Sequence, residues 1–164
     1  MADLDGLLRR DGERYAVRFE RRYAYRQDEL WSALTEPARL RRWLGADVLA
    51  GALGPGGEFT FRWNDDDGQT SRCRVLVWDP VSTLELEWGF GGEPDSVVRF
   101  QLAPAGEASV LTVDHRLLPA DQAAGYAAGW QAHLDTLAGA DLPSWDDRFM
   151  AVWPAYKDQL TGLD

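Results

Sequence analysis

The sequence predicts an α+β fold in which a one-sided antiparallel sheet is covered by a single long helix that comes late in the chain. Short segments of alternating apolar and polar residues follow one another from residue 13 to residue 118, with turn-forming clusters between them. No such segment alternates with a long helical pattern, which argues against a parallel sheet wound with helices. One long amphipathic pattern then occupies residues 119–139.

The chain is predicted to begin with a β-hairpin. Asp11 and Gly12 form a dipeptide that readily adopts the positive φ angles of a two-residue turn. In the second arm, residues 13–25, apolar side chains alternate with charged ones as in a half-buried strand. Arg21 interrupts the apolar face, and two alternatives stay open for it: a place near the sheet edge, or a guanidinium that projects into a partly polar cavity.

Two short helices are predicted after this first long strand. Asp28 is a favourable N-cap for the first helix, residues 29–34. Pro37 suits the start of the second helix, which is expected to end at Gly45. The glycine- and proline-rich residues 53–57 then break regular structure.

The remaining strands are predicted to form a meander that is apolar on one face and polar on the other. The expected strands are residues 59–63, 71–79, 83–89, 97–103 and 109–118.

The late helix has an unusual first half that consists almost entirely of alanine and glycine. Pro119 suits its first position, and Gly139 is a natural residue to close its last turn. Gly125 and Gly129 in its interior each cost on the order of 1 kcal/mol relative to alanine. Either close approach of the helix to the sheet or room for a ligand beneath the helix would explain them.

Apolar residues continue at helical spacing after this helix, with Pro154 expected to kink or split the element. We expect a short helical appendage here rather than a second domain. The expected organisation is therefore a single domain, residues 1–164, with a core at about 15–139, an N-terminal hairpin arm at 1–14 and a helical C-terminal extension at 140–164.

The composition excludes several classes of partner. With 27 acidic and 17 basic residues, the net charge is −10, and such a surface repels nucleic acid and anionic membranes. The single cysteine, Cys73, cannot form an internal disulfide and is expected in the core. No secretory signal or membrane span is recognisable, so we expect a cytoplasmic protein without nucleic-acid binding or membrane insertion.

Several motifs in a fixed order carry a resemblance to a known family. They are LWSALTEPARLRRWLG in the two short helices, Gly-Pro-Gly-Gly-x-Phe-x-Phe before the meander, LTVDHRL in its last strand and AAGWQAHLDTL in the late helix. Over about residues 15–139 the chain resembles the SRPBCC, or START-like helix-grip, superfamily. Within it, the chain is similar to the branch related to the C-terminal domain of the activator of the heat-shock-protein-90 ATPase.

The resemblance implies a helix-grip fold, in which a curved antiparallel sheet wraps around the long helix and leaves a hydrophobic cavity between them. In the superfamily this cavity often takes lipids, polyketides or hormones. The candidate ligand-binding residues come from three places. By their inward parity on the strands, Phe59, Phe61, Trp63, Trp88, Phe100 and His115 are expected to line the cavity floor. Tyr126, Trp130 and His133 are expected to face them from the late helix, with Trp43 near the entrance.

The two histidines are the candidate catalytic residues. His115 and His133 could exchange protons or help to bind a metal across the cavity, because imidazole titrates near neutral pH. The alternative is that each is a core histidine with a local hydrogen bond. The aspartate-rich residues 64–68 read as a solvated hairpin loop, since an EF-hand alignment puts Trp63 at the first ligand position. We expect no metal site and no cofactor.

Three hypotheses for function follow. The first is a binding protein, not an enzyme, for an apolar or aromatic small molecule. The second is an enzyme of the cyclase or aromatase kind that uses the same cavity. The third is a stress-linked, co-chaperone-like domain that binds a chaperone ATPase through its surface. A chaperone and a second copy of the chain, as a homodimer, stay open as protein partners.

Overall fold

The computed structural model describes residues 4–63, 69–90, 95–139 and 145–163. The predicted aspartate-rich loop at 64–68 and the turn-forming cluster at 91–94, between two of the predicted strands, lie outside these residues. The described elements follow one another along the chain in the order β1 (Leu7–Asp11), β2 (Arg14–Tyr23), α1 (Gln27–Thr35), α2 (Pro37–Leu44), β3 (Ala46–Gly51), β4 (Glu58–Trp63), β5 (Thr70–Asp79), β6 (Thr83–Phe90), β7 (Ser96–Ala105), β8 (Ala108–Leu118), α3 (Ala123–Leu137) and α4 (Trp145–Thr161).

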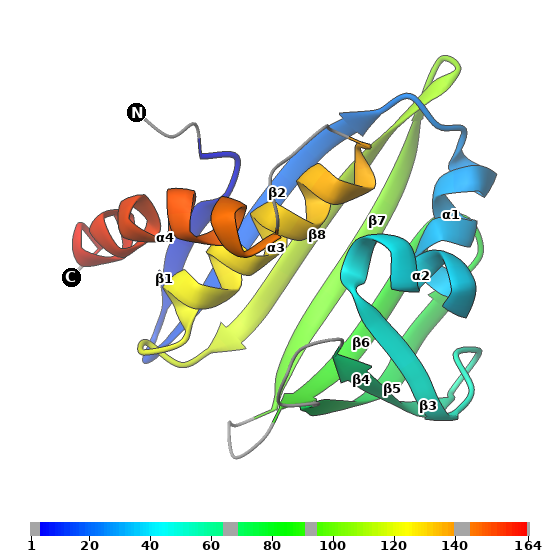
Figure 1. The fold of residues 1–164 in the computed structure, drawn as a ribbon, viewed down its shortest axis with the longest axis horizontal. Helices are drawn as coiled ribbons and strands as arrows, with labels where there is room; N and C mark the ends of the chain where they lie inside the picture. The colour runs from blue at the N-terminus through cyan, green and yellow to red at the C-terminus, as the bar shows by residue number, and fades with distance from the viewer. Residues whose placement is uncertain (1–3, 64–68, 91–94, 140–144, 164) are drawn as a thin grey trace.

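The strands form one curved antiparallel sheet that is covered by helices, as Figure 1 shows. Within the described residues the sheet has eight strands in the order β1-β2-β8-β7-β6-β5-β4-β3. Every pair of neighbours is consecutive in the chain except β2 and β8, so the sheet is a meander closed by its first long strand. Helix α3 packs against β2, α1 packs against β7 and β8, and α2 packs against β3. The predicted α+β helix-grip fold is thus confirmed.

The N-terminal hairpin forms as predicted, with Gly12 at φ +65° in its turn. Strand β1 pairs only with Arg14–Arg18 of β2, so Arg21 lies beyond the end of β1, where β2 is locally the edge of the sheet. Its guanidinium nevertheless turns to the helix and donates to Oδ1 of Asp135 in α3 at 2.5 Å. Arg21 therefore combines both alternatives: an edge position and a partly polar inner environment.

Helix boundaries differ from the prediction at two N-termini. Asp28 does not cap α1, because the N-cap is Arg26, whose backbone N–H donates to the Glu29 side chain at 3.4 Å. Helix α3 begins at Ala123 rather than Pro119, since the Pro119 carbonyl instead accepts N–H groups in a preceding turn. The predicted closures hold, with Gly45 at φ +69° after α2 and Gly139 at φ +71° after α3.

Strand β3 is an element that the sequence analysis missed. It is the last strand of the sheet, and a register shift between Val48 and Ala50 breaks the alternation that would have marked it. It ends at Gly51, which has φ +83°. A Cβ atom there would lie 1.9 Å from the carbonyl oxygen of Glu58, so only glycine fits this close approach to β4.

Helix α4 runs through Pro154 without splitting. A proline removes one i→i−4 hydrogen bond, here to the carbonyl of Met150. Met150 is exposed, so water can satisfy that carbonyl, and the buried Val152 and Tyr156 hold the helix against the body of the protein.

The core lies between the inner face of the sheet and the helices. It is built largely from the large inward side chains of the strands, including Phe19, Phe61 and Leu84, and from the buried face of α3. Cys73 is buried in it, as predicted.

None of the helices in the described part of the chain is long and apolar enough to cross a membrane.

Candidate functional site

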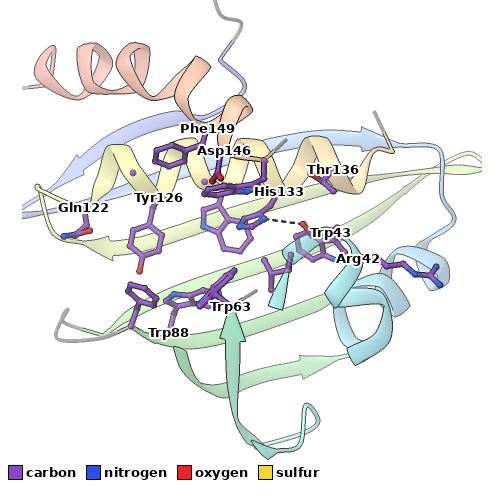
Figure 2. A pocket seen from close by; sticks show the side chains of 17 residues that line it. Arg42, Trp43, Trp63, Trp88, Gln122, Tyr126, His133, Thr136, Asp146 and Phe149 are labelled. Carbon is purple, nitrogen blue, oxygen red and sulfur yellow. Dashed lines mark hydrogen bonds between the residues drawn. The ribbon is translucent and has the colours of Figure 1, made fainter. Parts of the chain in front are cut away.

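An open groove of about 720 Å³ lies between α3, α4, α2 and the inner face of β4 and β6. Figure 2 shows Trp63 and Trp88 on the strands, with Tyr126 and His133 on α3 facing them and Phe149 from α4 beside them. The lining residues are Arg42, Trp43, Leu44, Gly45, Trp63, Trp88, Phe90, Gln122, Gly125, Tyr126, Gly129, Trp130, His133, Thr136, Trp145, Asp146 and Phe149.

Aromatic rings in mutual contact form the walls of this groove. The Trp88 ring lies 5.9 Å, centroid to centroid, from both Trp63 and Trp130. The His133 ring stacks on Trp63 at 5.8 Å and lies 5.3 Å from Trp145 on its other side. Aromatic pairs prefer such offset and edge-on arrangements, so these rings support one another along the groove.

Gly125 and Gly129 line the groove from the side of α3. A Cβ atom at Gly125 would meet nothing within 4 Å, and one at Gly129 would make only an ordinary contact of 3.7 Å with Trp145. Neither glycine is required by close approach to the sheet. Of the two explanations open from the sequence, the positions of these glycines therefore favour room beneath the helix.

The structure brings together six of the ten sequence-predicted ligand-binding residues along the groove. They are Trp43, Trp63, Trp88, Tyr126, Trp130 and His133.

The other four predicted residues lie elsewhere. Phe61 and Phe100 face an internal void of about 10 Å³, which is too small for a ligand, and the rings of Trp88 and Trp130 lie next to them. Phe59 borders a separate depression of about 320 Å³ that is lined by residues of β3, β4, β5 and β6. The inward parity of a strand residue gives its face but not its depth in the core, which is why the sequence could not separate these four from the rest.

His115, the fourth of these residues, is a fully buried core histidine. Trp130 donates its indole N–H to Nδ1 at 2.9 Å, so the ring proton resides on Nε2, which donates to Oγ of Ser96 at 2.7 Å. Burial lowers the pKa of His115 to about 3, which keeps the ring neutral. With both nitrogens engaged, His115 holds Trp130 in place and does not reach the groove.

His133 does line the groove, although it is also largely buried. Its Nδ1 donates to the carbonyl oxygen of Trp43 at 3.3 Å, which leaves Nε2 as an acceptor. Burial lowers the pKa of His133 to about 4, and the hydrogen bond to Trp43 opposes this only in part. A neutral imidazole with so low a pKa is a weak base at pH 7.

Trp88 carries a buried polar atom that its neighbours leave unsatisfied. Among the described residues, no group accepts a hydrogen bond from its indole Nε1–H. Leaving a buried donor unpaired costs about 1–3 kcal/mol. The indole N–H groups of three other tryptophans of the groove do have acceptors. Trp43 donates to the Ala33 carbonyl, Trp63 donates to Ser71, and Trp130 donates to His115.

Helix α4 supplies groove residues that sequence reasoning missed. Trp145, Asp146 and Phe149 form the wall next to α3. The apolar spacing of this segment was visible in the sequence, but the element it packs on was not. Phe90, at the end of β6, was missed because the predicted strand stopped one residue short.

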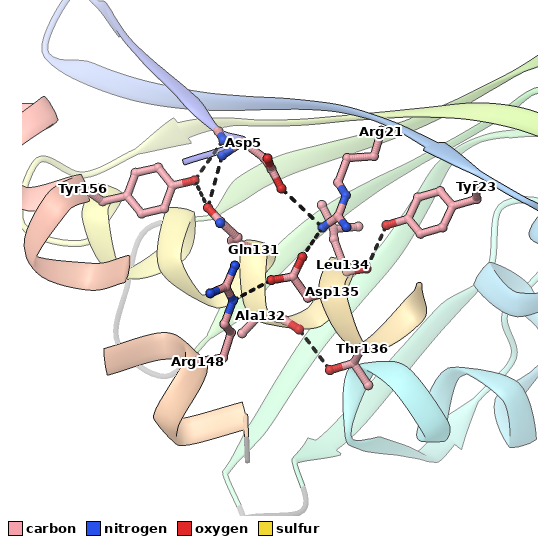
Figure 3. Close-up of polar contacts among 11 residues, drawn as sticks. Asp5, Arg21, Tyr23, Gln131, Ala132, Leu134, Asp135, Thr136, Arg148 and Tyr156 are labelled. Carbon is pink, nitrogen blue, oxygen red and sulfur yellow. Dashed lines mark hydrogen bonds and ion pairs between the residues drawn. The ribbon is translucent and has the colours of Figure 1, made fainter. Parts of the chain in front are cut away.

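A polar network on the far side of α3 holds α4 in position (Figure 3). Asp135 of α3 accepts a hydrogen bond from Arg21 of β2 through Oδ1, and one from Arg148 of α4 through Oδ2 at 2.7 Å. Farther along, the hydroxyl of Tyr156 donates to Gln131 and accepts the backbone N–H of Gly6. Burial raises the pKa of Tyr156, so this hydroxyl stays protonated. Helices α3 and α4, which both line the groove, are thus held together by residues outside its lining.

Comparison with known proteins places the chain in a family context. Residues 24–140 match the family described as Activator of Hsp90 ATPase homolog 1-like protein. No curated protein sequence matches the chain.

Solved structures show the same fold. The crystal structure of CalU16 from Micromonospora echinospora has 26% sequence identity and a TM-score of 0.78, with 95% of this chain and 97% of that chain covered. DynU16, described as a protein in the dynemicin biosynthetic locus, has 30% identity and a TM-score of 0.61, with 76% of this chain but only 46% of DynU16 covered. The HSP90 activator PFC0360w from Plasmodium falciparum has 18% identity and a TM-score of 0.54, with 64% and 74% covered, and is similar in fold alone.

Proposed function

This chain belongs to the Activator of Hsp90 ATPase homolog 1-like family, and from that premise we propose that it binds an apolar or aromatic small molecule in the groove between α3, α4 and the sheet. The observation that carries the proposal is an open, mostly aromatic groove backed by two glycines of α3. A volume of about 720 Å³ is within the range of small-molecule sites, roughly 300–1,000 Å³.

The groove offers the kind of surface from which such a ligand gains affinity. Burial of apolar ligand surface contributes about 25 cal/mol per Å² removed from water. The only charged lining residues in the described part of the chain, Arg42 and Asp146, are exposed and opposite in sign, so the interior favours an uncharged ligand. The likeness to DynU16, whose locus is a biosynthetic one, also supports a small-molecule role.

A groove-filling substitution tests the proposal. Gly125→Phe would place a ring into open space in the groove without meeting a neighbour at Cβ. We expect ligands found by thermal-shift screening or native mass spectrometry to lose at least tenfold in affinity for this variant. Gly125→Ala is the matched control, because it makes the same backbone change and leaves the groove open.

The proposal fails if no member of a broad lipid and aromatic library raises the melting temperature of the wild type and no small molecule remains bound after purification. It also fails if ligands bind the Gly125→Phe and Gly125→Ala variants equally well, because the binding would then be outside the groove.

The family favours a second candidate, binding to a chaperone ATPase through the protein surface. Net charge −10 and the exposed charges on the outer sheet face would then carry the interaction. This candidate predicts that the wild type and Gly125→Phe capture a heat-shock-protein-90 chaperone equally. Failure of both to capture it removes the candidate.

A further inference from the structure

We propose that the ligand of the groove is an uncharged aromatic molecule with a hydroxyl group, a phenol, and that this hydroxyl donates a hydrogen bond to Nε2 of His133. The inference rests on the proposed small-molecule function. It goes further by naming the polar group that the ligand carries and the protein atom that recognises it.

The free acceptor on His133 is the first observation behind this class. Nδ1 of His133 lies 3.3 Å from the carbonyl oxygen of Trp43, and a carbonyl only accepts, so the ring proton resides on Nδ1. Burial lowers the pKa of His133 to about 4, so at pH 7 the ring is neutral and Nε2 carries a lone pair. Among the described residues, no group donates a hydrogen bond to that lone pair.

Nε2 of His133 is accessible from the groove. In the described part of the chain, two fully buried side-chain nitrogen or oxygen atoms lack a hydrogen-bond partner, and they are Nε1 of Trp88 and Nε of Arg99. Nε2 of His133 has no partner either but is not one of these two atoms, so it keeps accessible surface. Because His133 lines the groove, that surface opens into it. Nε2 also belongs to the ring edge farthest from Cβ, and Figure 2 shows this side chain extending from α3 toward the strands.

The two glycines of α3 leave space beside His133. Gly129 and Gly125 lie four and eight residues before His133, so the three positions share one stripe of the helix. A helical side chain leans over the turn that precedes its own Cα, which for His133 is the turn that holds Gly129. A Cβ atom at Gly129 would make only an ordinary contact of 3.7 Å with Trp145, and one at Gly125 would meet nothing within 4 Å. A ligand that lies along this stripe therefore has one end at His133.

The rings around His133 favour an aromatic carrier for the hydroxyl. Trp63 stacks on the imidazole at 5.8 Å, Trp145 lies 5.3 Å from it, and Trp130 meets it edge-on at 6.0 Å. A flat ligand ring can stack on such rings or meet them edge-on. A phenol oxygen lies in the plane of its ring, so the edge of the ligand can reach Nε2 while its faces contact the walls. An ionised carboxylate only accepts hydrogen bonds and would leave Nε2 unpaired.

Two probes of nearly the same shape test the inference. 2-Naphthol and 2-methylnaphthalene are both flat and uncharged, and only 2-naphthol has an O–H group. Because a methyl group is more hydrophobic than a hydroxyl, the informative quantity is the ratio of the two affinities. The His133→Phe variant keeps a ring but lacks the lone pair. We expect calorimetric titration to give a naphthol-to-methylnaphthalene ratio about tenfold higher for the wild type than for His133→Phe, equivalent to about 1.4 kcal/mol.

His133→Gln is the matched variant, because its side-chain oxygen can accept a hydrogen bond near the position of Nε2. It should recover part of the preference for 2-naphthol. Trp145→Phe, which changes another wall of the groove, should alter both affinities and preserve their ratio. If His133→Phe does not fold, the ¹⁵N resonance of Nε2 in the wild type provides a second readout. 2-Naphthol should move this resonance upfield, and 2-methylnaphthalene should not.

Several results would overturn the inference. Equal affinity ratios for the wild type and His133→Phe remove the hydrogen bond while leaving the proposed function intact. Tighter binding of decahydro-2-naphthol, the saturated counterpart, than of 2-naphthol removes the aromatic class, and tighter binding of 2-naphthoate at pH 7 removes the uncharged class. Both outcomes also leave that function intact. If none of the four probes binds, the inference is wrong, and the library screen above decides separately whether the groove binds small molecules.

Discussion

Trp130 of α3 donates its indole N–H to Nδ1 of His115 in β8 across 2.9 Å, and no part of the His115 side chain reaches solvent. This bond ties the long helix to the centre of the sheet through a ring that also forms a wall of the groove. The histidine that the sequence marked as a candidate for catalysis is thereby a positioning element of the core. Its burial in a neutral form has a consequence for stability.

Acid should destabilise the protein through its histidines. The pKa values of His115 and His133, about 3 and about 4, are below the ordinary value of 6.5 because of burial. Between about pH 4 and pH 6.5 the unfolded chain therefore binds protons that the folded chain does not. The free energy of unfolding should fall as the pH is lowered through this window, by up to about 1.4 kcal/mol per pH unit for each histidine.

Urea unfolding at pH 7, 6 and 5 measures this effect. In His115→Gln the amide oxygen can still accept the Trp130 N–H, but one titrating group is gone, so the decline should be shallower than in the wild type. Identical slopes for the two proteins would mean that His115 takes up its proton without unfolding.

The carboxylate of Asp135 should contribute strongly to the attachment of α4. It is 7% exposed and accepts one hydrogen bond from Arg21 and one from Arg148. Asp135→Asn keeps the size but removes the charge that both arginines share, so that, among the described residues, Arg21 keeps only its ion pair with Asp5 at 3.5 Å. We expect the free energy of unfolding to fall by about 2 kcal/mol, which is below the 3–5 kcal/mol typical of a broken buried pair because both arginines are partly exposed.

Asp114→Asn is the control for this prediction. Asp114 pairs with Arg9, whose side chain is 45% exposed, and surface pairs are worth about 0–1 kcal/mol. Chemical unfolding of both variants gives the comparison. Equal losses of stability would show that the network around Asp135 contributes no more to the free energy of unfolding than a surface ion pair does.

Gly125→Ala should stabilise the protein. The new methyl group meets nothing within 4 Å, and alanine is favoured over glycine inside a helix by roughly 1 kcal/mol. We expect a gain of about 0.5–1 kcal/mol in the free energy of unfolding with ligand affinity unchanged. A loss of stability would mean that the helix backbone at this position needs glycine.

Cys73 should be unreactive in the folded protein. Burial raises the pKa of its thiol to about 12, so almost no thiolate is present at pH 8. Labelling with a thiol reagent such as dithiobisnitrobenzoate should be slow in buffer and complete within minutes in 6 M urea. Rapid labelling in buffer would show that the region around β5 opens readily.

Much of the fold could be predicted from short-range patterns. Alternation placed Trp63 and Trp88 on the inner face, helical spacing and Gly45 and Gly139 marked helices and their ends, and the order of elements indicated the family. Strand β3 was not predicted because its register shift breaks the alternation of apolar and polar residues. This segment is a strand because it pairs with β4.

The apolar face of each strand and helix follows from the order of the residues alone, because side-chain direction repeats every 2 residues in a strand and every 3.6 in a helix. How deeply each side chain is buried, and which side chains it contacts, depends on how the elements pack against one another. The packing of the elements places His115 against Trp130, leaves the Trp88 N–H without an acceptor among the described residues, and brings Trp145 and Phe149 to the groove. Those outcomes depend on contacts between residues far apart in the chain, which the spacing of apolar residues along the sequence does not reveal.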